Sequence, residues 1–380
     1  MDGPTVVDLF CGAGGLSVGF ARTGFRPVLG IDRDPDGLAT YAAAFGCPVL
    51  SWDAPPGGGS VPDGLPRADV VVSGPPCQGF SPLNVRRDGD GRRDHLSNVV
   101  DVAVACDADA FVVENVPEFL GTDEEAAFRA RSDEEGYATM ASVLCAADYG
   151  VPQVRTRAFL LGTRHARPSA FPPAPTHSRH AGVMDDLFLP LRPWLTVRDA
   201  IGDLPPPGRG GFGVGTPPFD LHVARDPERR SVERYRTVPP GGNRMDVVRT
   251  RPDLASPSWK KAHPGVLTDI FGRLWWDRPS VTVRTDFKPE KGRYLHPEQH
   301  RPITHREAAR LSGFDDGHPF KGGRRSIARQ IGNAVPPPLA AAIARSVLVS
   351  ISTGGIAPSD ALPGAERSHA SETAAASDRP

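Results

Sequence analysis

One cysteine of this chain lies in a segment that is suited to covalent chemistry. Cys77 belongs to Ser73–Ser81 (Ser-Gly-Pro-Pro-Cys-Gln-Gly-Phe-Ser), which directly follows the apolar run Val70–Val72. Gly-Pro-Pro cannot continue a strand or a helix, because proline fixes φ and lacks an N–H donor. The segment therefore predicts a turn that presents Cys77 at the carboxyl end of a strand, where open α/β sheets bind ligands. Its thiolate would be a nucleophile, although an isolated cysteine is more often a small buried residue.

A carboxylate follows the next apolar run. Phe111–Val113 predicts a buried strand, and Glu114 comes at its end. The segment Leu96–Ala105 has helical spacing, so the two strands fit one βαβ unit. This unit would place Cys77 and Glu114 at the same edge of the sheet. Without Cys77, the simpler interpretation of Glu114 would be an N-capping or loop carboxylate.

A third turn follows the predicted strand Thr5–Val7. The segment Asp8–Leu16 (Asp-Leu-Phe-Cys-Gly-Ala-Gly-Gly-Leu) is rich in glycine. A glycine-rich turn from a strand to a helix suits a nucleotide-like ligand. Taken alone, such a turn is weak evidence for function.

Together these segments resemble the DNA (cytosine-5)-methyltransferase family, of the type found in bacterial restriction-modification systems. Matching blocks occur in the family's usual order and cover about residues 5–165 and 270–350. The blocks are Asp8–Phe20, Gly74–Ser81, Glu114–Val116, Tyr149–Arg157, Arg306–Phe314 and Gln330–Pro337. Their common order makes the resemblance far more specific than any single block.

The resemblance implies transfer of a methyl group from S-adenosylmethionine to carbon 5 of a cytosine in DNA. Carbon 5 is a poor nucleophile until the thiolate of Cys77 adds to carbon 6. Glu114 would supply a proton to ring nitrogen 3, and Arg157 would contact the carbonyl at carbon 2. Arg155 would order the loop or touch a phosphate. The alternative for both arginines is a solvated loop pair.

Residues near the first turn are implied to bind S-adenosylmethionine. Phe10 would pack against the adenine, and Asp32 would bond the ribose hydroxyls, where the family more often has glutamate. Asp53 would accept from the adenine amino group, and Asn333 would close the pocket, unless its block is only a helix end before a proline. The other cofactor residues that the resemblance implies are Gly12, Gly14, Gly15, Leu16 and Pro76.

A cytosine inside a duplex cannot meet Cys77, because attack comes from above the ring, where the neighbouring base pair lies. The base must therefore leave the stack, at a cost of about a few kcal/mol. The loop at residues 79–91 is rich in glycine and charge, and it would close over the flipped base; a solvated charged loop is an equal alternative. The DNA contacts that we predict here are Gln78, Ser81, Arg86 and Arg87.

The order of apolar runs predicts an α/β fold with a doubly wound, mostly parallel sheet, which matches a Rossmann-like class I S-adenosylmethionine-dependent methyltransferase. A second, smaller and irregular domain would recognise the target. We assign residues 1–165 to the catalytic and cofactor-binding domain, 166–272 to target recognition, 273–352 to the return of the chain and 353–380 to a disordered tail. The predicted helices of the first part are Leu16–Thr23, Asp36–Ala44, Leu96–Ala105 and Thr139–Ala146.

Residues 166–272 lose the α/β pattern and are rich in Pro, Gly and Arg, as a disordered linker would be. Aromatic residues nevertheless offer anchors for a small core: Trp194, Tyr235, Trp259 and Phe271. The core pattern resumes with a predicted helix over Ile303–Phe314, N-capped by Thr304, and a final helix over Leu339–Ile351.

Charge is divided unevenly, although the net charge is only −1. Residues 1–150 hold 10 Lys and Arg against 23 Asp and Glu, whereas residues 222–310 hold 19 against 11. This division suits a chain that meets DNA mainly with its later part. The five cysteines are unevenly spaced, and neither a zinc spacing nor a membrane-spanning run is present. We expect a cytoplasmic, nucleoid-associated monomer that binds double-stranded DNA, no metal and no membrane; a cognate restriction endonuclease would not be physically required.

Three rival classes remain. A tRNA cytosine-5-methyltransferase uses the same chemistry, but that branch usually carries a Cys-Phe-Thr element that this chain lacks. A catalytically silent DNA-binding relative would not need every chemical residue. A small-molecule methyltransferase would need neither Cys77 nor the basic interval.

Overall fold

The computed structural model describes residues 3–76, 95–164, 168, 170–181, 190–224, 227–261, 270–285, 287 and 292–352. Cys77 and the predicted DNA contacts Gln78, Ser81, Arg86 and Arg87 lie outside the described residues, as does the predicted tail 353–380.

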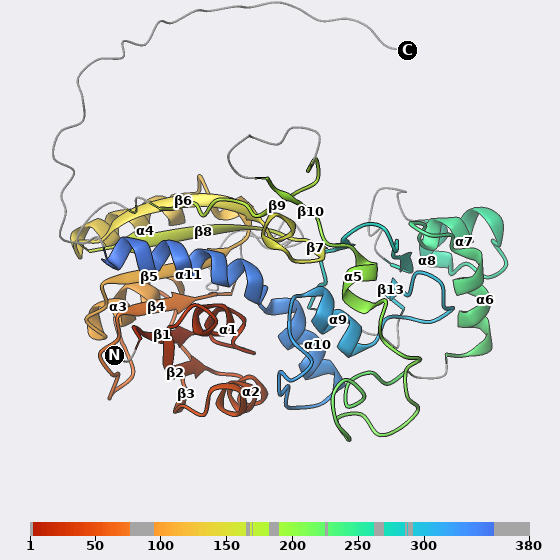
Figure 1. Cartoon of the computed structure of the whole chain (residues 1–380), viewed down its shortest axis with the longest axis horizontal. Helices are drawn as coiled ribbons and strands as arrows, with labels where there is room; N and C mark the ends of the chain where they lie inside the picture. Colours follow the sequence, from red (N-terminus) through yellow and green to blue (C-terminus); the bar gives the residue numbers. More distant parts are fainter. Residues whose placement is uncertain are drawn as a thin grey trace, which may run out of the picture.

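A seven-stranded sheet forms the centre of the catalytic half (Figure 1). Along the sheet the strands are β3 (Val49–Ser51), β2 (Arg26–Asp32), β1 (Thr5–Leu9), β4 (Val70–Ser73), β5 (Ala110–Asn115), β8 (Thr156–Thr163) and β6 (Ala138–Cys145). The first five are parallel, and β8 is antiparallel to both of its neighbours. The predicted mostly parallel α/β sheet is confirmed. Its order reverses between β1 and β4, the position where such sheets bind ligands.

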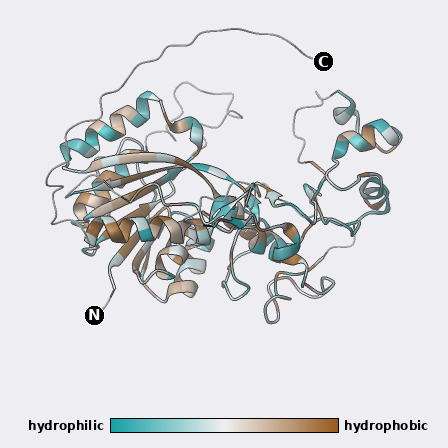
Figure 2. Ribbon diagram, turned by 45° about the horizontal axis from the view of Figure 1, so that its top comes forward, coloured by the Kyte–Doolittle hydropathy of each residue, from teal (hydrophilic) through white to brown (hydrophobic). Residues whose placement is uncertain are grey.

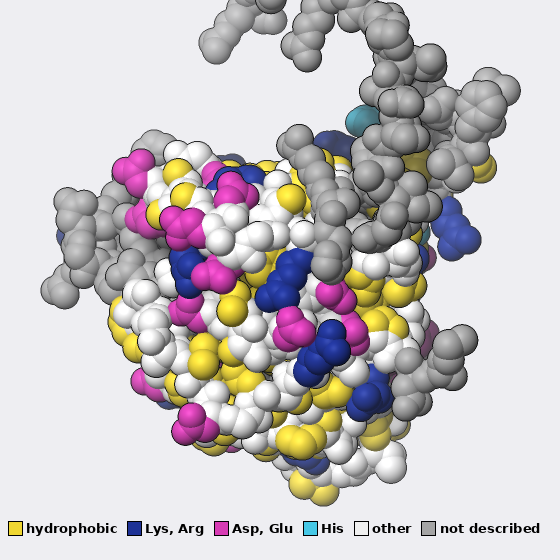
Figure 3. All heavy atoms as spheres, turned by 90° about the vertical axis from the view of Figure 1, so that its left-hand side faces the viewer, with side chains coloured by type: hydrophobic (Ala, Val, Ile, Leu, Met, Phe, Trp, Pro, Cys, Tyr) yellow, Lys and Arg dark blue, Asp and Glu magenta, His cyan; other side chains and the backbone are white. Residues whose placement is uncertain are grey.

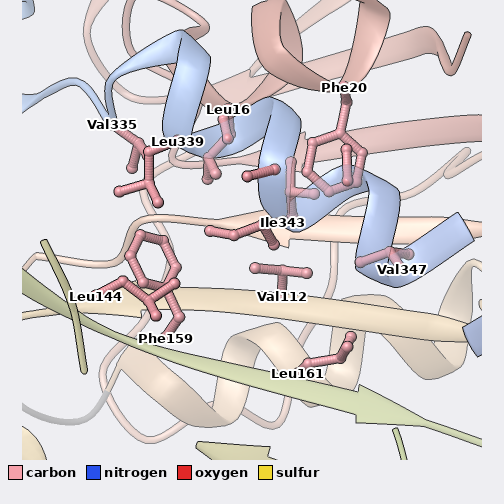
Figure 4. Packing of buried hydrophobic residues seen from close by; sticks show 14 of the residues in the cluster. Leu16, Phe20, Val112, Leu144, Phe159, Leu161, Val335, Leu339, Ile343 and Val347 are labelled. Carbon is pink, nitrogen blue, oxygen red and sulfur yellow. The ribbon is translucent and has the colours of Figure 1, made fainter. Parts of the chain in front are cut away.

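Helices cover both faces of this sheet. They are α1 (Gly15–Ala21), α2 (Pro35–Phe45), α3 (Ser97–Ala105), α4 (Asp123–Glu134) and α11 (Pro337–Ser352). Val70 and Val72 pack under α1 and α11, in the cluster that Figure 4 shows. Val71 points to the opposite face, which α3 and α4 cover, because successive strand residues alternate in direction. Figure 2 shows the hydrophobic colours concentrated in this layered region.

The helices α1 and α11 approach each other closely. A Cβ atom at Gly19 would lie 2.4 Å from the Cβ of Ala340, so only glycine permits this contact. The final helix was predicted as Leu339–Ile351 and is confirmed, with its start two residues earlier.

The predicted helix Thr139–Ala146 is wrong, because this segment forms strand β6. Its eight residues pair with β8 from Ala138, opposite Thr163, to Cys145, opposite Thr156. Apolar residues at positions 140, 143 and 144 imitate a helical spacing. The long ladder with β8, which comes later in the chain, outweighs this local pattern.

Sequence patterning also missed helix α4. Only Phe128 and Ser132 of this helix are buried, so it has no apolar stripe to reveal it. Its start is nevertheless well defined, since Thr122 Oγ1 accepts a hydrogen bond from the backbone N–H of Glu125 at 3.2 Å.

The later part of the chain consists of short elements. The helices are α5 (Val197–Ile201), α6 (Arg229–Thr237), α7 (Arg244–Thr250), α8 (Pro257–Lys260), α9 (His305–Leu311) and α10 (Arg324–Asn333). Three pairs of short strands are parallel. In these pairs β7 (Gln153–Val154) lies beside β12 (Ser280–Val281), β9 (His177–Ser178) beside β10 (Arg192–Pro193), and β11 (Gly272–Arg273) beside β13 (Tyr294–Leu295). The predicted helix within Ile303–Phe314 is confirmed as α9. Its N-cap Thr304 forms a capping box with Glu307.

Helices α6, α7 and α8 form a separate unit on the right of Figure 1, which we call the helical module (residues 227–261). Its core joins Tyr235, Val238, Val247, Leu254, Phe271 and Leu295, with Trp259 packed against it. Three of the predicted aromatic anchors therefore meet. Trp194 was wrongly placed among them, because its indole N–H instead donates to Asp148 Oδ1 at 2.8 Å.

The segment at residues 190–224 packs on the catalytic side. Val197 and Ile201 of α5 share a buried cluster with Ile303 and Ala308. Arg306 of α9 donates to Asp220 Oδ1 at 2.7 Å. Residues 166–272 thus include one stretch against the catalytic domain and another in the helical module.

Within the described part of the chain, no single helix is long and apolar enough to cross a membrane. Helices α10 and α11, bent by 41° where they meet, pass that test together on length and composition alone.

Candidate active site

The centre of the candidate site is an ion pair at the carboxyl end of β5. Glu114 is only 7% exposed, and its Oε1 lies 3.0 Å from Nε of Arg157. Arg157 comes from β8, the antiparallel neighbour in which Phe159 pairs with Glu114. Two of the four predicted catalytic residues are therefore in direct contact.

The turn that leads to Cys77 lies beside this pair. Strands β4 and β5 are adjacent and parallel, with Ser73 opposite Val113. A Cβ built on Gly74 would lie 3.7 Å from Oε2 of Glu114. The expectation that Glu114 and the start of the cysteine loop share one sheet edge is confirmed for the described residues.

Buried polar atoms collect at the same edge. In the described part of the chain, Ser73 Oγ and Asn115 Nδ2 are buried without a hydrogen-bond partner. Buried polar atoms are normally paired, so such atoms at a sheet edge mark a place that a polar ligand or a closing loop would complete.

Arg155 lies apart from this ion pair. It is 4% exposed, and its Nη1 donates at 2.9 Å to the carbonyl oxygen of Gly332, near the end of α10. Its Nη2 donates to the carbonyl of Asn333 at 3.4 Å. Of the two roles predicted for Arg155, these contacts favour ordering of the chain over contact with a phosphate. Asn333 itself is exposed at the end of α10.

Three cysteines among the described residues are poor nucleophiles. Burial raises the pKa of Cys106 to about 11 and that of Cys11 well above its ordinary value. Burial also raises the pKa of Cys47. These three side chains stay protonated thiols at neutral pH, and the thiol is the unreactive form.

The glycine-rich turn after β1 is shaped partly by packing. Gly14 has φ +77°, and a Cβ there would lie 2.6 Å from the ring of Phe45; a Cβ on Gly15 would lie 2.2 Å from the carbonyl oxygen of Val335. Gly12 differs, because its φ is +49° and no atom lies within 4 Å of a Cβ placed there. Gly12 therefore borders open space at the switch point of the sheet. Leu16 is buried in the core under α11, so it could offer a ligand only its backbone.

Asp32 organises this turn from the end of β2. Its Oδ2 accepts from the N–H of Gly12 at 2.8 Å, and its Oδ1 accepts from Asp34 N–H at 2.9 Å. Phe10 has φ +58° and is partly buried, as a residue that lines a pocket would be. Asp53 is exposed, and its Oδ1 lies 3.3 Å from Nη1 of Arg33. Pro76 is the last described residue before Cys77.

These features fit S-adenosylmethionine. Gly12 leaves room at the switch point, Asp32 presents a carboxylate beside that space, and Phe10 offers an aromatic ring from the same turn. Acceptors at the end of the second strand suit the hydroxyls of a ribose in this class of sheet.

Sequence analysis missed a buried carboxyl group under this turn. Asp8 is 1% exposed and accepts from Ser17 Oγ at 2.6 Å, while Ser17 Oγ lies 2.7 Å from the hydroxyl of Tyr41. Burial, reinforced by the charge of Asp32, raises the pKa of Asp8 to about 7. An aspartate at the end of an apolar strand was the available signal.

We expect the stability contribution of Asp8 to depend on pH. The pKa of Asp8 is higher in the folded protein than its unfolded value of 3.8. The free energy of unfolding therefore falls as pH rises from about 4 to about 7. Full ionisation would cost roughly 4 kcal/mol. Urea unfolding measures the free energy of unfolding of Asp8→Asn and of the parent at pH 4.5 and pH 8. Relative to the parent, the variant should be more stable at pH 8 than at pH 4.5. Exposed Asp63→Asn is the control, and an Asp8→Asn difference that is equal at both pH values would contradict this account.

Charge is also divided in space. Helix α4 carries acidic residues at both ends, Asp123, Glu124 and Glu125 at its start and Asp133 and Glu134 in its last turn. Figure 3 views the molecule from the end opposite the helical module, and acidic side chains gather in the upper left of that view. The helical module carries exposed arginines, among them Arg229 and Arg249.

Comparison with known proteins identifies the class. The model of the C-5 cytosine-specific DNA methylase family matches residues 4–207 and 228–348. The chain is 34% identical to the type II methyltransferase M1.HphI of Haemophilus parahaemolyticus, over 90% of this chain and 86% of that protein. It is 30% identical to the type II methyltransferase M.AgeI of Thalassovita gelatinovora, over 91% of this chain and 99% of that protein.

Solved structures agree on the fold. A protein described as a prophage-encoded DNA modification methyltransferase from E. coli superposes with a TM-score of 0.63, at 22% identity, over 92% of this chain and 99% of that one. The Dnmt2 methyltransferase of S. pombe superposes with a TM-score of 0.53, at 15% identity, over 92% and 98%. The chain belongs to the C-5 cytosine-specific DNA methylase family. It is a DNA cytosine-5-methyltransferase of the type II kind.

Proposed function

We propose that this enzyme transfers a methyl group from S-adenosylmethionine to carbon 5 of a cytosine that is flipped out of a specific duplex sequence, through a covalent bond between Cys77 and carbon 6. The observation that carries the proposal is the Glu114–Arg157 pair beside Gly74, at the start of the loop that contains Cys77.

Each residue has a distinct part in this chemistry. The sulfur of Cys77 forms a bond to carbon 6, and the electron pair of the 5,6 double bond becomes available at carbon 5. Glu114 would supply the proton that ring nitrogen 3 takes up, which requires that its carboxyl group carries a proton when the base enters. S-adenosylmethionine supplies an electrophilic methyl group when it is bound. Transfer of the proton from carbon 5 to a water molecule then restores the double bond and releases the thiolate, while ring nitrogen 3 returns its proton to Glu114.

Arg157 would bind the base and also hold Glu114. Its Nε already lies 3.0 Å from Glu114, so the guanidinium orients the carboxyl group before any base arrives. Arg157 is 19% exposed, which leaves part of the guanidinium free to meet a carbonyl oxygen of an entering cytosine. Arg155 would support the site indirectly through the end of α10.

The cofactor would lie over the turn after β1. We propose that Phe10 packs against the adenine, that Asp32 accepts from the ribose hydroxyls, and that Gly12 admits the methionine part. Asp53 is the natural acceptor for the adenine amino group, since its carboxylate is exposed. Gly14, Gly15 and Leu16 shape the turn, while Pro76 and Asn333 border it.

We propose that the helical module recognises the DNA sequence. It would belong to a recognition domain at residues 166–272, and residues 1–165 and 273–352 would form the catalytic domain. Arg229 is 95% exposed and Arg249 is 74% exposed, so both could reach phosphates by exchanging their present partners, Glu233 and Asp246. Gln78, Ser81, Arg86 and Arg87 would contact the DNA from the loop after Cys77. The protein would act as a monomer, without need of a restriction endonuclease.

The test is to map methylated cytosines in cells that express this chain. We expect 5-methylcytosine at one short duplex sequence in genomic DNA and none in tRNA above the level of the host. Cells that express Cys77→Ala serve as the control. Methylation of tRNA with unmodified DNA would show that the substrate is RNA, and methylation of neither nucleic acid would overturn the proposed function.

A further inference from the structure

Among the described residues, the helical module and the catalytic domain meet at the short pair of strands β11 and β13. The buried cluster that joins α5, α9 and α10 on the catalytic side is called here the catalytic core. Within β13, Tyr294 belongs to this cluster and Leu295 to the core of the helical module. Beside β11, Phe271 packs into the module and Leu274 into the catalytic core. This strand pair is therefore the seam between the two cores.

Arg273 lies in the middle of this seam and is 4% exposed. Its Nη2 donates to the carbonyl oxygen of Tyr235 at 2.7 Å, and its Nε donates to that of Val238 at 2.7 Å. Tyr235 is near the end of α6, and Val238 is its C-cap. One edge of the guanidinium thus holds the end of the first module helix.

The remaining donor of Arg273 points to the other side of the seam. Nη1 donates to three carbonyl oxygens: that of His296 at 2.6 Å, that of Gln299 at 3.0 Å and that of Pro297 at 3.4 Å. These carbonyls belong to the turn after β13. A single buried side chain therefore bonds to backbone on both sides of the seam.

The turn after β13 is itself fixed to helix α9. Gln299 Oε1 accepts from Arg301 Nε at 2.6 Å. Arg301 forms a bidentate pair with Glu307 at 2.9 and 2.7 Å, and Glu307 caps α9 together with Thr304. Hydrogen bonds thus run from α6 through Arg273 to a helix of the catalytic domain.

We propose that Arg273 is a positioning residue that fixes the orientation of the helical module relative to the catalytic domain, and thereby the position in which DNA is offered to the site. The effect on the position of DNA rests on the proposed function. The planar guanidinium is needed because its donors point in several fixed directions, whereas lysine offers its donors from one nitrogen.

The test compares Arg273→Lys with a matched control, Val247→Ala. Val247 is fully buried in the module core, so its truncation weakens the module without removing any hydrogen bond of Arg273. Spin labels on unnatural amino acids at exposed Arg249 and Val349 report the distance between α7 and α11. We expect Arg273→Lys to broaden the distance distribution clearly and Val247→Ala to leave it narrow. This readout does not depend on any activity.

Steady-state kinetics then test the link to DNA. Arg273→Lys should raise KM for duplex DNA about tenfold or more and reduce discrimination between target and non-target sites. Its KM for S-adenosylmethionine should not change. If Arg273→Lys does not fold, the milder Gln299→Ala, which removes one bond from the same link, should show a smaller broadening in the same direction.

A distance distribution as narrow as that of the parent in folded Arg273→Lys would overturn the proposal. If Arg273→Lys does not fold, the same result in Gln299→Ala would overturn it. Equal broadening in Val247→Ala would also overturn it, because Arg273 would then act only through stability. A broad distribution in an enzyme whose parent methylates no DNA would support the orienting role and refute the proposed function.

Discussion

Cys77→Ser is expected to abolish methyl transfer, with a loss of at least about a thousandfold in kcat. A serine hydroxyl is scarcely ionised near neutral pH and adds poorly to carbon 6. Tritium transfer from labelled S-adenosylmethionine to target duplex measures the rate, and calorimetry measures binding of the cofactor. We expect binding to stay close to that of the parent, because the predicted cofactor residues lie mainly on the turn after β1.

A trapping experiment shows whether the loss reflects covalent chemistry. In the presence of cofactor, DNA with 5-fluorocytosine at the target should form a stable adduct with the parent after methyl transfer, since fluorine cannot leave as a cation. Cys77→Ser should form none. Cys145→Ser, at the end of β6, is the matched control and should retain both activity and adduct. Retention of more than about a tenth of parental activity by Cys77→Ser would remove Cys77 from the mechanism.

The sheet edge that carries Glu114 could be predicted from the sequence because the predicted residues there come at the ends of buried strands. Val70–Val72 and Phe111–Val113 are continuous apolar runs, as expected for strands covered on both faces. Glu114 could therefore be placed at a sheet edge from its position alone. The contact between Glu114 and Arg157 could not, because it depends on antiparallel pairing of β8 with β5.

The errors have a common cause in contacts between distant parts of the chain. The segment Thr139–Ala146 becomes a strand only because β8 pairs with it. Trp194 has an aromatic side chain suited to a small core, but Asp148 binds its indole N–H on the catalytic side. Asp8 gains its raised pKa from burial beneath α1 and from the nearby Asp32, which no local pattern reports.

The second large effect is expected for Glu114→Gln. Glutamine retains the size and hydrogen-bonding capacity of glutamate, but it cannot release a proton to ring nitrogen 3. General acid catalysis typically contributes a factor of about 10² to 10⁴, so kcat should fall by that amount. The ion pair with Arg157 is also lost, which should loosen the base contact and raise KM for DNA.

The matched control for this variant is Glu118→Gln. Glu118 follows in the same loop, within the 3-10 turn Pro117–Phe119, and its side chain is exposed. It should keep parental kcat. Two rates should fall in Glu114→Gln: single-turnover methylation under saturating cofactor and adduct formation on 5-fluorocytosine DNA. Both should fall because proton uptake accompanies formation of the Cys77 bond. If adduct formation kept its parental rate while turnover on ordinary target DNA slowed, Glu114 would act after methyl transfer, and its assignment as the proton donor for nitrogen 3 would be wrong.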